Sequence, residues 1–292
     1  MKLRLGTLCL FENPTGEDGR ALIRQFVLAR EADRMGYDDV WLVERHGDAS
    51  RPSGAITTLL GHLSGVTSKA RVGAVLLPEG RHGLQLAEDL ATVELLSRGR
   101  LALAVDAQDV ASADAVLDSL DWLRARLDGG HHDNDLIPRP SGERPLAWAL
   151  TADVHVARSI AARGFGLCLP PDLPLDAVSA LLSHYRDAVP ENGDGARPMP
   201  MLVRYACPAE THDEALAIAT LYLNARVGVE HAGGVLAHSL VGNHAEVAAQ
   251  IRGLGAELGL YGILIIPMSA HFDTAKHILA DMVDEVRPLL DD

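Results

Sequence analysis

The fold is decided by residues 67–105, which read TSKARVGAVLLPEGRHGLQLAEDLATVELLSRGRLALAV. The runs at 71–77 and 101–106 are almost wholly apolar, as is typical of parallel strands that are covered on both faces. Between them, residues 85–96 carry apolar side chains at helical spacing and end before Ser97-Arg98-Gly99. A strand, a helix and a second strand in this order indicate a parallel βα unit.

The same alternation continues along the rest of the chain. Eight strands, each followed by a helix, predict an α/β fold, a single (β/α)₈ TIM barrel that occupies residues 1–292 as one domain. A doubly wound open sheet is the alternative, because alternation alone does not prove closure, and the stretch between the last two strands is long enough for an insertion. The expected strands are 3–10, 39–43, 71–77, 101–106, 146–150, 167–169, 201–206 and 262–267.

The helices expected between these strands have recognisable ends. The first, at 20–35, stops at Gly36, a residue that favours the left-handed conformation found after helices. Ser112 is expected to cap a helix that runs to residue 127. The other expected helices are 85–96, 152–163, 174–189, 211–226, 243–258 and 275–290, and a further one covers the small-residue stretch from Ala55 to Gly65.

Composition excludes several classes of protein. The net charge of −14 disfavours nucleic acid and anionic membrane surfaces, which require a basic face. The three cysteines are widely spaced in apolar segments, so we expect buried free thiols and a reducing compartment. No stretch approaches the roughly 20 apolar residues of a membrane span, and the N-terminal residues do not have the pattern of an export signal. We therefore expect a cytoplasmic protein that binds neither nucleic acid nor membrane.

Active sites of such barrels lie at the C-terminal ends of the strands. Glu44-Arg45-His46 is the densest group of ionisable residues at any of these ends, and a histidine there can serve as a general acid or base. The alternative is a surface ion pair between Glu44 and Arg45, with His46 as a polar cover. The chain contains no HExxH or CxxC spacing, so we expect no metal, and no glycine-rich nucleotide loop of the GxGxxG or Walker type.

Three segments resemble the bacterial luciferase-like flavin monooxygenases. They are FVLAREADRMGYDDVWLVERH at 26–46, the segment 67–105 quoted above, and LVGNHAEVAAQI at 240–251. The resemblance implies a (β/α)₈ barrel, reduced FMN supplied by a separate flavin reductase, molecular oxygen and a small-molecule substrate. It also implies that His46 orients or protonates the reacting group, that Glu44 orients His46, and that Ala74 and Val75 pack against the flavin ring. F420 is an alternative cofactor, because related barrels use it.

The resemblance further implies a dimer that packs through the second and third helices, either a homodimer or a heterodimer. The second helix offers a surface of small side chains that permits close approach, although ordinary barrel packing explains the same pattern. The residues of that surface are Ala55, Thr58, Gly61, Leu63, Ser64 and Gly65.

Several positions depart from the family pattern around the flavin phosphate. Arg45 stands where members commonly have the first of two adjacent histidines, and Ala107, which follows Asp106 at the end of the fourth strand, stands where luciferases place a phosphate-binding arginine. After the fifth strand, Thr151-Ala152-Asp153 replaces serines or glycines at a helix N-terminus. Thr151 can still donate, but Asp153 lies where the phosphate would be bound and can cap the helix instead. The Asp153 carboxylate and a phosphate about 4 Å away would repel by about 4 kcal/mol at an effective dielectric of 20. We therefore expect weak phosphate binding unless Arg45 or Arg81 compensates.

Two hypotheses follow for the function. The first is a flavin-dependent monooxygenase that oxygenates a small organic substrate. The second is a catalytically weak or silent barrel that dimerises with an active paralogue, similar to the non-catalytic β subunit of bacterial luciferase. The run IIPMSAHFDTAKHILADMVDEV at 265–286 is similar to the end of that subunit.

Overall fold

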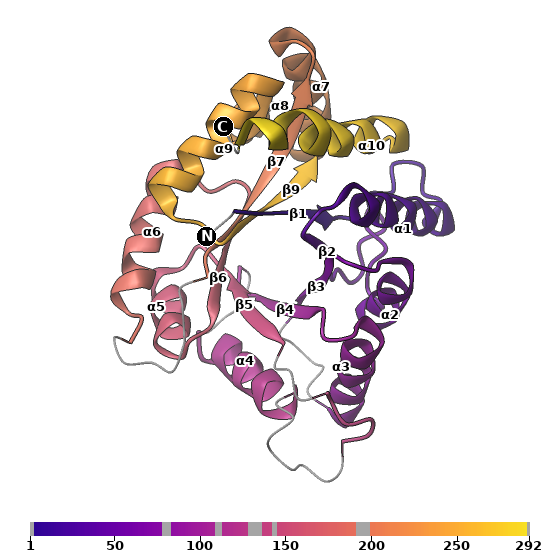
Figure 1. The fold of residues 1–292 in the computed structure, drawn as a ribbon, viewed down its shortest axis with the longest axis vertical. Coiled ribbons are helices and arrows are strands. Elements are labelled where there is room, and N and C mark those ends of the chain that lie inside the picture. The colour runs from indigo at the N-terminus through magenta and orange to yellow at the C-terminus, as the bar shows by residue number, and fades with distance from the viewer. Residues whose placement is uncertain are drawn as a thin grey trace.

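A parallel barrel forms the centre of the computed structural model, which describes residues 3–77, 83–108, 113–127, 136–141, 145–190 and 199–290 (Figure 1). Strands β1 to β6 pair in chain order, β6 pairs with β7, and β9 joins β7 back to β1, so the ring is closed. This closure confirms the (β/α)₈ barrel and excludes an open doubly wound sheet. The strands of the ring are β1 (Arg4–Cys9), β2 (Asp39–Val43), β3 (Arg71–Leu76), β4 (Leu101–Asp106), β5 (Leu146–Leu150), β6 (Gly166–Leu169), β7 (Met201–Ala209) and β9 (Gly262–Pro267).

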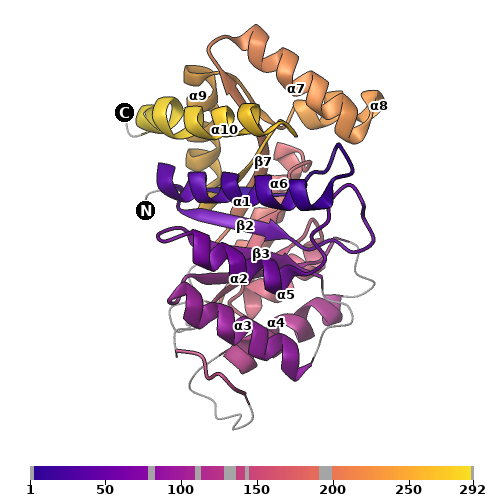
Figure 2. The same cartoon turned by 90° about the vertical axis from the view of Figure 1, so that its right-hand side faces the viewer.

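Helices surround the ring on its outer side, and Figure 2 shows several of them running roughly side by side along the barrel. Gly36 ends α1 with a φ of 93°, as predicted for a glycine after a helix. Ser112, the expected cap of α4, lies outside the described residues. The helices are α1 (Asp18–Met35), α2 (Ile56–Val66), α3 (Leu84–Ser97), α4 (Ala113–Leu127), α5 (Val154–Ala162), α6 (Leu175–Asp187), α7 (His212–Val227), α8 (Val229–Leu236), α9 (His244–Leu258) and α10 (Phe272–Asp281).

The connection from β7 to β9 holds the insertion that the sequence allowed. It contains α7, α8, α9 and a short strand, β8 (Leu240–Asn243), which pairs with the last four residues of β7 outside the ring. This pairing explains why β7 extends beyond the expected end at residue 206. The prediction missed β8 because its pattern was assigned to the following helix. In fact Asn243 ends the strand and caps α9 in a capping box with Glu246.

The C-terminal helix is also shorter than predicted. The α-helical part, α10, stops at Asp281, and the chain continues as a π-helical turn (Met282–Val286) and a 3₁₀ turn (Arg287–Leu290). Met282 and Val286 are nevertheless buried, so the apolar periodicity that predicted a long helix reflects packing against the barrel. The prediction of one uniform helix at 275–290 was wrong in its geometry.

Two tryptophans fill the interior of the barrel. Trp41 and Trp148 are fully buried and meet edge to face, with ring centroids 5.5 Å apart and planes at 80°. Glycines on neighbouring strands make room for them: a Cβ at Gly73 would lie 2.1 Å from the Trp41 ring, and one at Gly166 would lie 2.1 Å from Trp148. The interior is therefore a packed core rather than a pore.

The N-terminal end of the barrel is held by charged side chains that bond to backbone. Asp33 of α1 accepts hydrogen bonds from the N–H groups of Ser68, Lys69 and Ala70 and from the Ser68 hydroxyl. Burial acts to raise the pKa of Asp33, but the hydrogen bonds from Ala70, Lys69 and Ser68 outweigh it and lower that pKa. Arg100 binds carbonyl oxygens of Ser64, Thr67, Ala70 and Ser97, which ties α2 and α3 to the loop before β3.

The cysteines are buried free thiols, as predicted. Burial raises the pKa of Cys9, Cys168 and Cys207 to about 12. Over the described part of the chain, no helix has both the length and the apolar character that a bilayer crossing requires. The same residues contain no group of three or more histidines, cysteines or carboxylates with metal-binding geometry.

Candidate functional site

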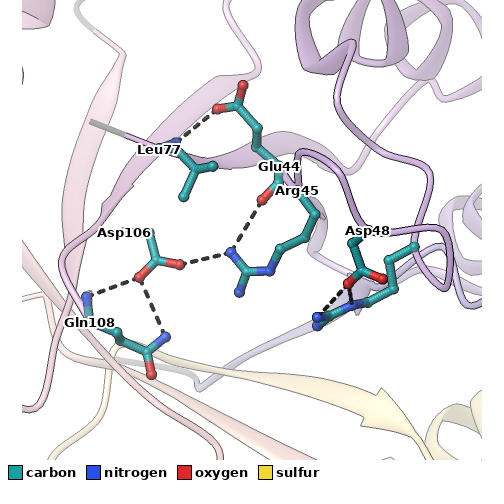
Figure 3. Close-up of polar contacts among 7 residues, drawn as sticks. Glu44, Arg45, Asp48, Leu77, Asp106 and Gln108 are labelled. Atoms are coloured by element: carbon teal, nitrogen blue, oxygen red, sulfur yellow. Dashed lines mark hydrogen bonds and ion pairs between the residues drawn. The ribbon is translucent and has the colours of Figure 1, made fainter. Parts of the chain in front are cut away.

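Glu44, the first residue after β2, carries a buried carboxylate at the C-terminal mouth of the barrel. It is 1% exposed, and its Oε2 accepts the N–H of Leu77 at 2.8 Å, as Figure 3 shows. Its Oε1 lies 2.9 Å from Nε2 of His46, whose side chain is half exposed. A buried carboxylate, fixed by the end of β3, thus orients an accessible imidazole.

The loop after His46 is itself well fixed. Asp48 accepts hydrogen bonds from the N–H and hydroxyl of Ser50 and from the Arg51 guanidinium. These bonds lower the pKa of Asp48 to about 2. Further along the loop, a Cβ at Gly54 would lie 3.0 Å from Nδ1 of His46. Glycine at this position therefore lets the loop backbone pass close to the His46 ring without a side-chain clash.

Arg45 turns away from the Glu44 carboxylate and crosses the mouth to β4. Its Nη1 lies 3.1 Å from Oδ2 of Asp106 and donates to the Glu44 carbonyl oxygen, as Figure 3 shows. Asp106 is 5% exposed, and its Oδ1 accepts the N–H of Gln108 at 3.1 Å. The alternative of an ion pair between the Glu44 and Arg45 side chains is therefore not what forms: Arg45 pairs with Asp106 and Glu44 pairs with His46.

The expected phosphate site is occupied by the protein's own carboxylate. Asp153 caps α5, and its Oδ1 accepts the N–H groups of His155 at 2.7 Å and Val156 at 2.9 Å. Thr151 is fully buried, and its Oγ1 accepts the Asp153 N–H instead of facing outward. Ala152 is exposed and contributes only its backbone. Three N–H groups at this helix N-terminus, those of Asp153, His155 and Val156, are thus engaged by the protein's own side chains, where other proteins use such groups to hold phosphate.

The remaining predicted residues divide between the two faces of their strands. Val75 belongs to the apolar cluster inside the barrel, so it can face a ligand at the mouth. Ala74 and Ala107 belong to the cluster between the strands and the helices, and the Ala107 N–H bonds to Leu150. Arg81, the other proposed compensating cation, lies outside the described residues.

A second polar group at the mouth was missed from the sequence. Glu12 follows β1, and its Oε1 accepts the hydroxyl proton of Tyr222 at 2.8 Å and lies 3.4 Å from Nε of Arg226. Glu12 could have been found from the sequence, because it lies just after a predicted strand, where active-site residues of such barrels lie. Tyr222 and Arg226 lie in the middle and last turn of α7, where the sequence resembles any surface helix.

Comparison with known proteins gives the family. The model of the luciferase-like monooxygenases matches residues 3–261. The chain belongs to this family. A luciferase-like monooxygenase of Escherichia coli K12 is 28% identical over 199 residues, which are 59% of this chain and 58% of that relative. The chain therefore aligns with little more than half the length of this curated family member.

Solved structures agree with the fold over nearly the whole chain. Apo-MsnO8 has a TM-score of 0.84 at 23% identity, covering 98% of this chain and 99% of that one. The oxygenating constituent of 3,6-diketocamphane monooxygenase from Pseudomonas putida, solved in complex with FMN, has a TM-score of 0.81 at 16% identity and covers 99% of both chains. At these identities the likeness establishes the barrel alone.

Proposed function

We propose that this luciferase-like family member is a flavin-dependent monooxygenase that uses reduced FMN from a separate reductase and O₂ to oxygenate a small organic substrate. The observation that carries the proposal is the buried Glu44 carboxylate that orients His46 at the mouth of the barrel. A bound reduced flavin would supply the two electrons with which O₂ gives one oxygen atom to the substrate and one to water.

The two ends of FMN differ in how well they fit the residues present. The ring end suits the mouth, where apolar Val75 lies below the polar pair Glu44 and His46. The phosphate end meets Asp153 at the start of α5, which already accepts the N–H groups of His155 and Val156 and adds a negative charge. FMN is therefore expected to bind through its ring, and riboflavin is expected to bind about as tightly as FMN.

The residues at the mouth have separable roles in this proposal. Glu44 accepts the Nε2–H of His46 and so fixes the plane of the ring and its tautomer. The half-exposed ring of His46, held in this way at the mouth, can hold or deliver a proton to a reacting oxygen. Arg45 is held against Asp106, so it positions the edge of the mouth between β2 and β4 rather than binding phosphate.

Equilibrium titration of the purified chain with FMN, reduced FMN, riboflavin and F420 tests the proposal. We expect saturable binding of reduced FMN and riboflavin with dissociation constants within about threefold of each other, because the phosphate contributes little. No binding of any flavin at high micromolar concentration would overturn it. Binding of F420 alone would assign the deazaflavin alternative.

The second candidate is a silent partner of an active paralogue. It is favoured by Asp153 at the expected phosphate site and by the exposed apolar side chains of α3: Leu84 is 48% exposed and Leu96 is 61% exposed. Such side chains suit the predicted contact through α2 and α3, with either a second copy or a paralogue. Flavin-dependent oxygen consumption by the lone chain would exclude this candidate, whereas a stable heterodimer that is active only through the paralogue would support it.

A further inference from the structure

A cavity of about 310 Å³ lies between α6, α9 and the chain that joins α8 to β8. These elements are on the outer side of the ring (Figure 1), so the cavity is separate from the mouth where His46 lies. Much of its wall is apolar and comes from Ala237, Leu240, Ala249 and Leu254. Arg204 of β7 also lines it, and this residue brings a charge to an otherwise largely apolar wall.

Arg204 points out of the barrel, into the layer between the strands and the helices. Its neighbours on the same side of β7, Leu202 and Ala206, belong to the apolar cluster of that layer, whereas Val203 and Tyr205 belong to the cluster inside the ring. Arg204 is only 2% exposed. A guanidinium is costly to bury in such a layer unless its charge and its N–H groups find partners.

The hydrogen bonds of Arg204 use one side of its guanidinium. Nη1 donates to the carbonyl oxygens of Pro170, Pro171 and Val203, and Nη2 donates to that of Leu173 at 2.8 Å. The N–H of Nε and the second N–H of Nη2 have no acceptor among the described residues, and Nε is not one of the unpartnered atoms there that are sealed from solvent. Because Arg204 lines the cavity, a ligand can reach the guanidinium at this edge.

The positive charge of Arg204 also lacks a close counterion. No carboxylate in the described part of the chain forms an ion pair with it, and the acidic residue that acts on it, Asp172, is exposed. Burial lowers the pKa of Arg204 to about 10, and Asp172 only partly opposes this effect. The group is therefore charged at neutral pH, and a buried charge without a counterion favours a bound anion.

The shape of the site selects among anions. Nε and Nη2 lie side by side on the guanidinium and match the two oxygens of a carboxylate. The apolar wall suits an aliphatic chain, and the volume equals that of about ten water molecules in the liquid, which limits the ligand to a small one. We propose that this cavity binds a short aliphatic carboxylate, with its carboxylate on Arg204 and its chain against Leu240 and Leu254. No flavin takes part in this binding.

Residues one turn apart on α9 allow the cavity to be filled without removing a hydrogen bond. Gly253 lines the cavity, and a Cβ there would meet no atom within 4 Å, so Gly253→Leu places a side chain in the open space and also favours the helix. Ala249→Leu fills the cavity one turn earlier. Ala245→Leu is the same change one further turn away, at an exposed position outside the cavity, and serves as the control. Arg204→Gln removes the charge.

Ligand-observed NMR titration of the flavin-free chain compares hexanoate, 1-hexanol, hexylammonium and inorganic phosphate. We expect hexanoate to bind saturably and at least about tenfold more tightly than each of the other three, because it alone combines a carboxylate with an aliphatic chain. Gly253→Leu, Ala249→Leu and Arg204→Gln should each weaken hexanoate binding at least about tenfold, and Ala245→Leu should leave it unchanged.

Several results would overturn the proposal. They are no binding of hexanoate, equal binding of 1-hexanol, tighter binding of phosphate, and unchanged hexanoate binding in the two filled variants. If Arg204→Gln does not fold, the filled variants together with the comparison of hexanoate and 1-hexanol decide the question. Hexanoate binding that persists in a chain without flavin affinity would keep this site and remove only the monooxygenase function.

Discussion

The two ends of the barrel use charged side chains in opposite ways. At the N-terminal end, Asp33 and Arg100 each bond to several backbone groups and join helices to strands. At the C-terminal end, the buried Glu44 carboxylate orients His46, whose side chain is half exposed. The first end uses these charges to stabilise the fold, while the second holds an ionisable ring where a ligand can reach it.

His46→Gln tests whether the C-terminal end of the barrel carries the chemistry. We expect flavin-dependent oxygen consumption to fall at least about 100-fold, since the proton-transfer group is lost while Gln retains an N–H near the Nε2 position. The thermal midpoint should hardly move, because His46 is half exposed. The control is His231→Gln on α8, where the side chain is 69% exposed, and it should leave activity intact. Equal losses in both variants would contradict the role of His46.

Asp33→Asn tests the opposite end. The substitution leaves an amide NH₂ facing N–H and hydroxyl donors of Ser68, so we expect a loss of about 2–4 kcal/mol in the free energy of unfolding. Urea denaturation measures it, and flavin affinity of the folded fraction should not change. Asp187→Asn at an exposed position of α6 is the control. A loss in the free energy of unfolding of less than about 0.5 kcal/mol, the size of an ordinary surface substitution effect, would show that Asp33 stabilises the fold less than its hydrogen bonds indicate.

The same carboxylate predicts a pH dependence of stability. The pKa of Asp33 in the folded protein is lowered, below the value of about 3.9 expected for the unfolded chain. Its contribution is therefore complete above the unfolded value and is lost as pH falls through the folded value. The difference in unfolding free energy between the native sequence and Asp33→Asn should shrink below about pH 4. A difference that stays constant down to pH 2 would contradict the ionic origin of the effect.

Asp153→Ser tests whether the charge of Asp153 opposes phosphate binding at the mouth. Serine keeps an N-cap for α5 but removes the negative charge from the expected phosphate position. We expect FMN affinity to rise about tenfold and riboflavin affinity to stay the same, since only FMN carries the phosphate. The tenfold rise is smaller than the unscreened repulsion between two charges would give, because Asp153 is exposed and solvent screens its charge. Isothermal titration with both ligands measures the ratio. An equal change for the two flavins would place the phosphate elsewhere.

The smallest effect is expected at the cysteines. With pKa values of about 12, Cys9, Cys168 and Cys207 are thiolates in roughly one part in ten thousand at pH 8. Iodoacetamide should therefore leave the native chain unmodified over an hour and alkylate all three cysteines in denaturant, as followed by intact-mass spectrometry. Rapid labelling of one native cysteine would reveal local opening around it.

The N-terminal half of the ring was readable in the sequence because its strands are continuous apolar runs separated by helices with clear ends. Residues 39–43 and 101–106 were predicted with the bounds that β2 and β4 have. The pattern failed where tertiary pairing alone creates an element. Residues 240–243 are too few to show a period, and they form β8 only because the end of β7 lies beside them.

The alternation of strands and helices, the buried thiols and the group Glu44-Arg45-His46 were readable in the sequence, because strand periodicity, apolar context and local density of ionisable residues are all properties of neighbours in the chain. Tertiary structure decided which partner each charge takes. Arg45 reaches Asp106 across β3, and Glu12 meets Arg226 from the far end of the chain. These pairs join residues 61 and more than 200 positions apart: parallel pairing of β2, β3 and β4 brings the first together, and packing of α7 beside the end of β1 brings the second together.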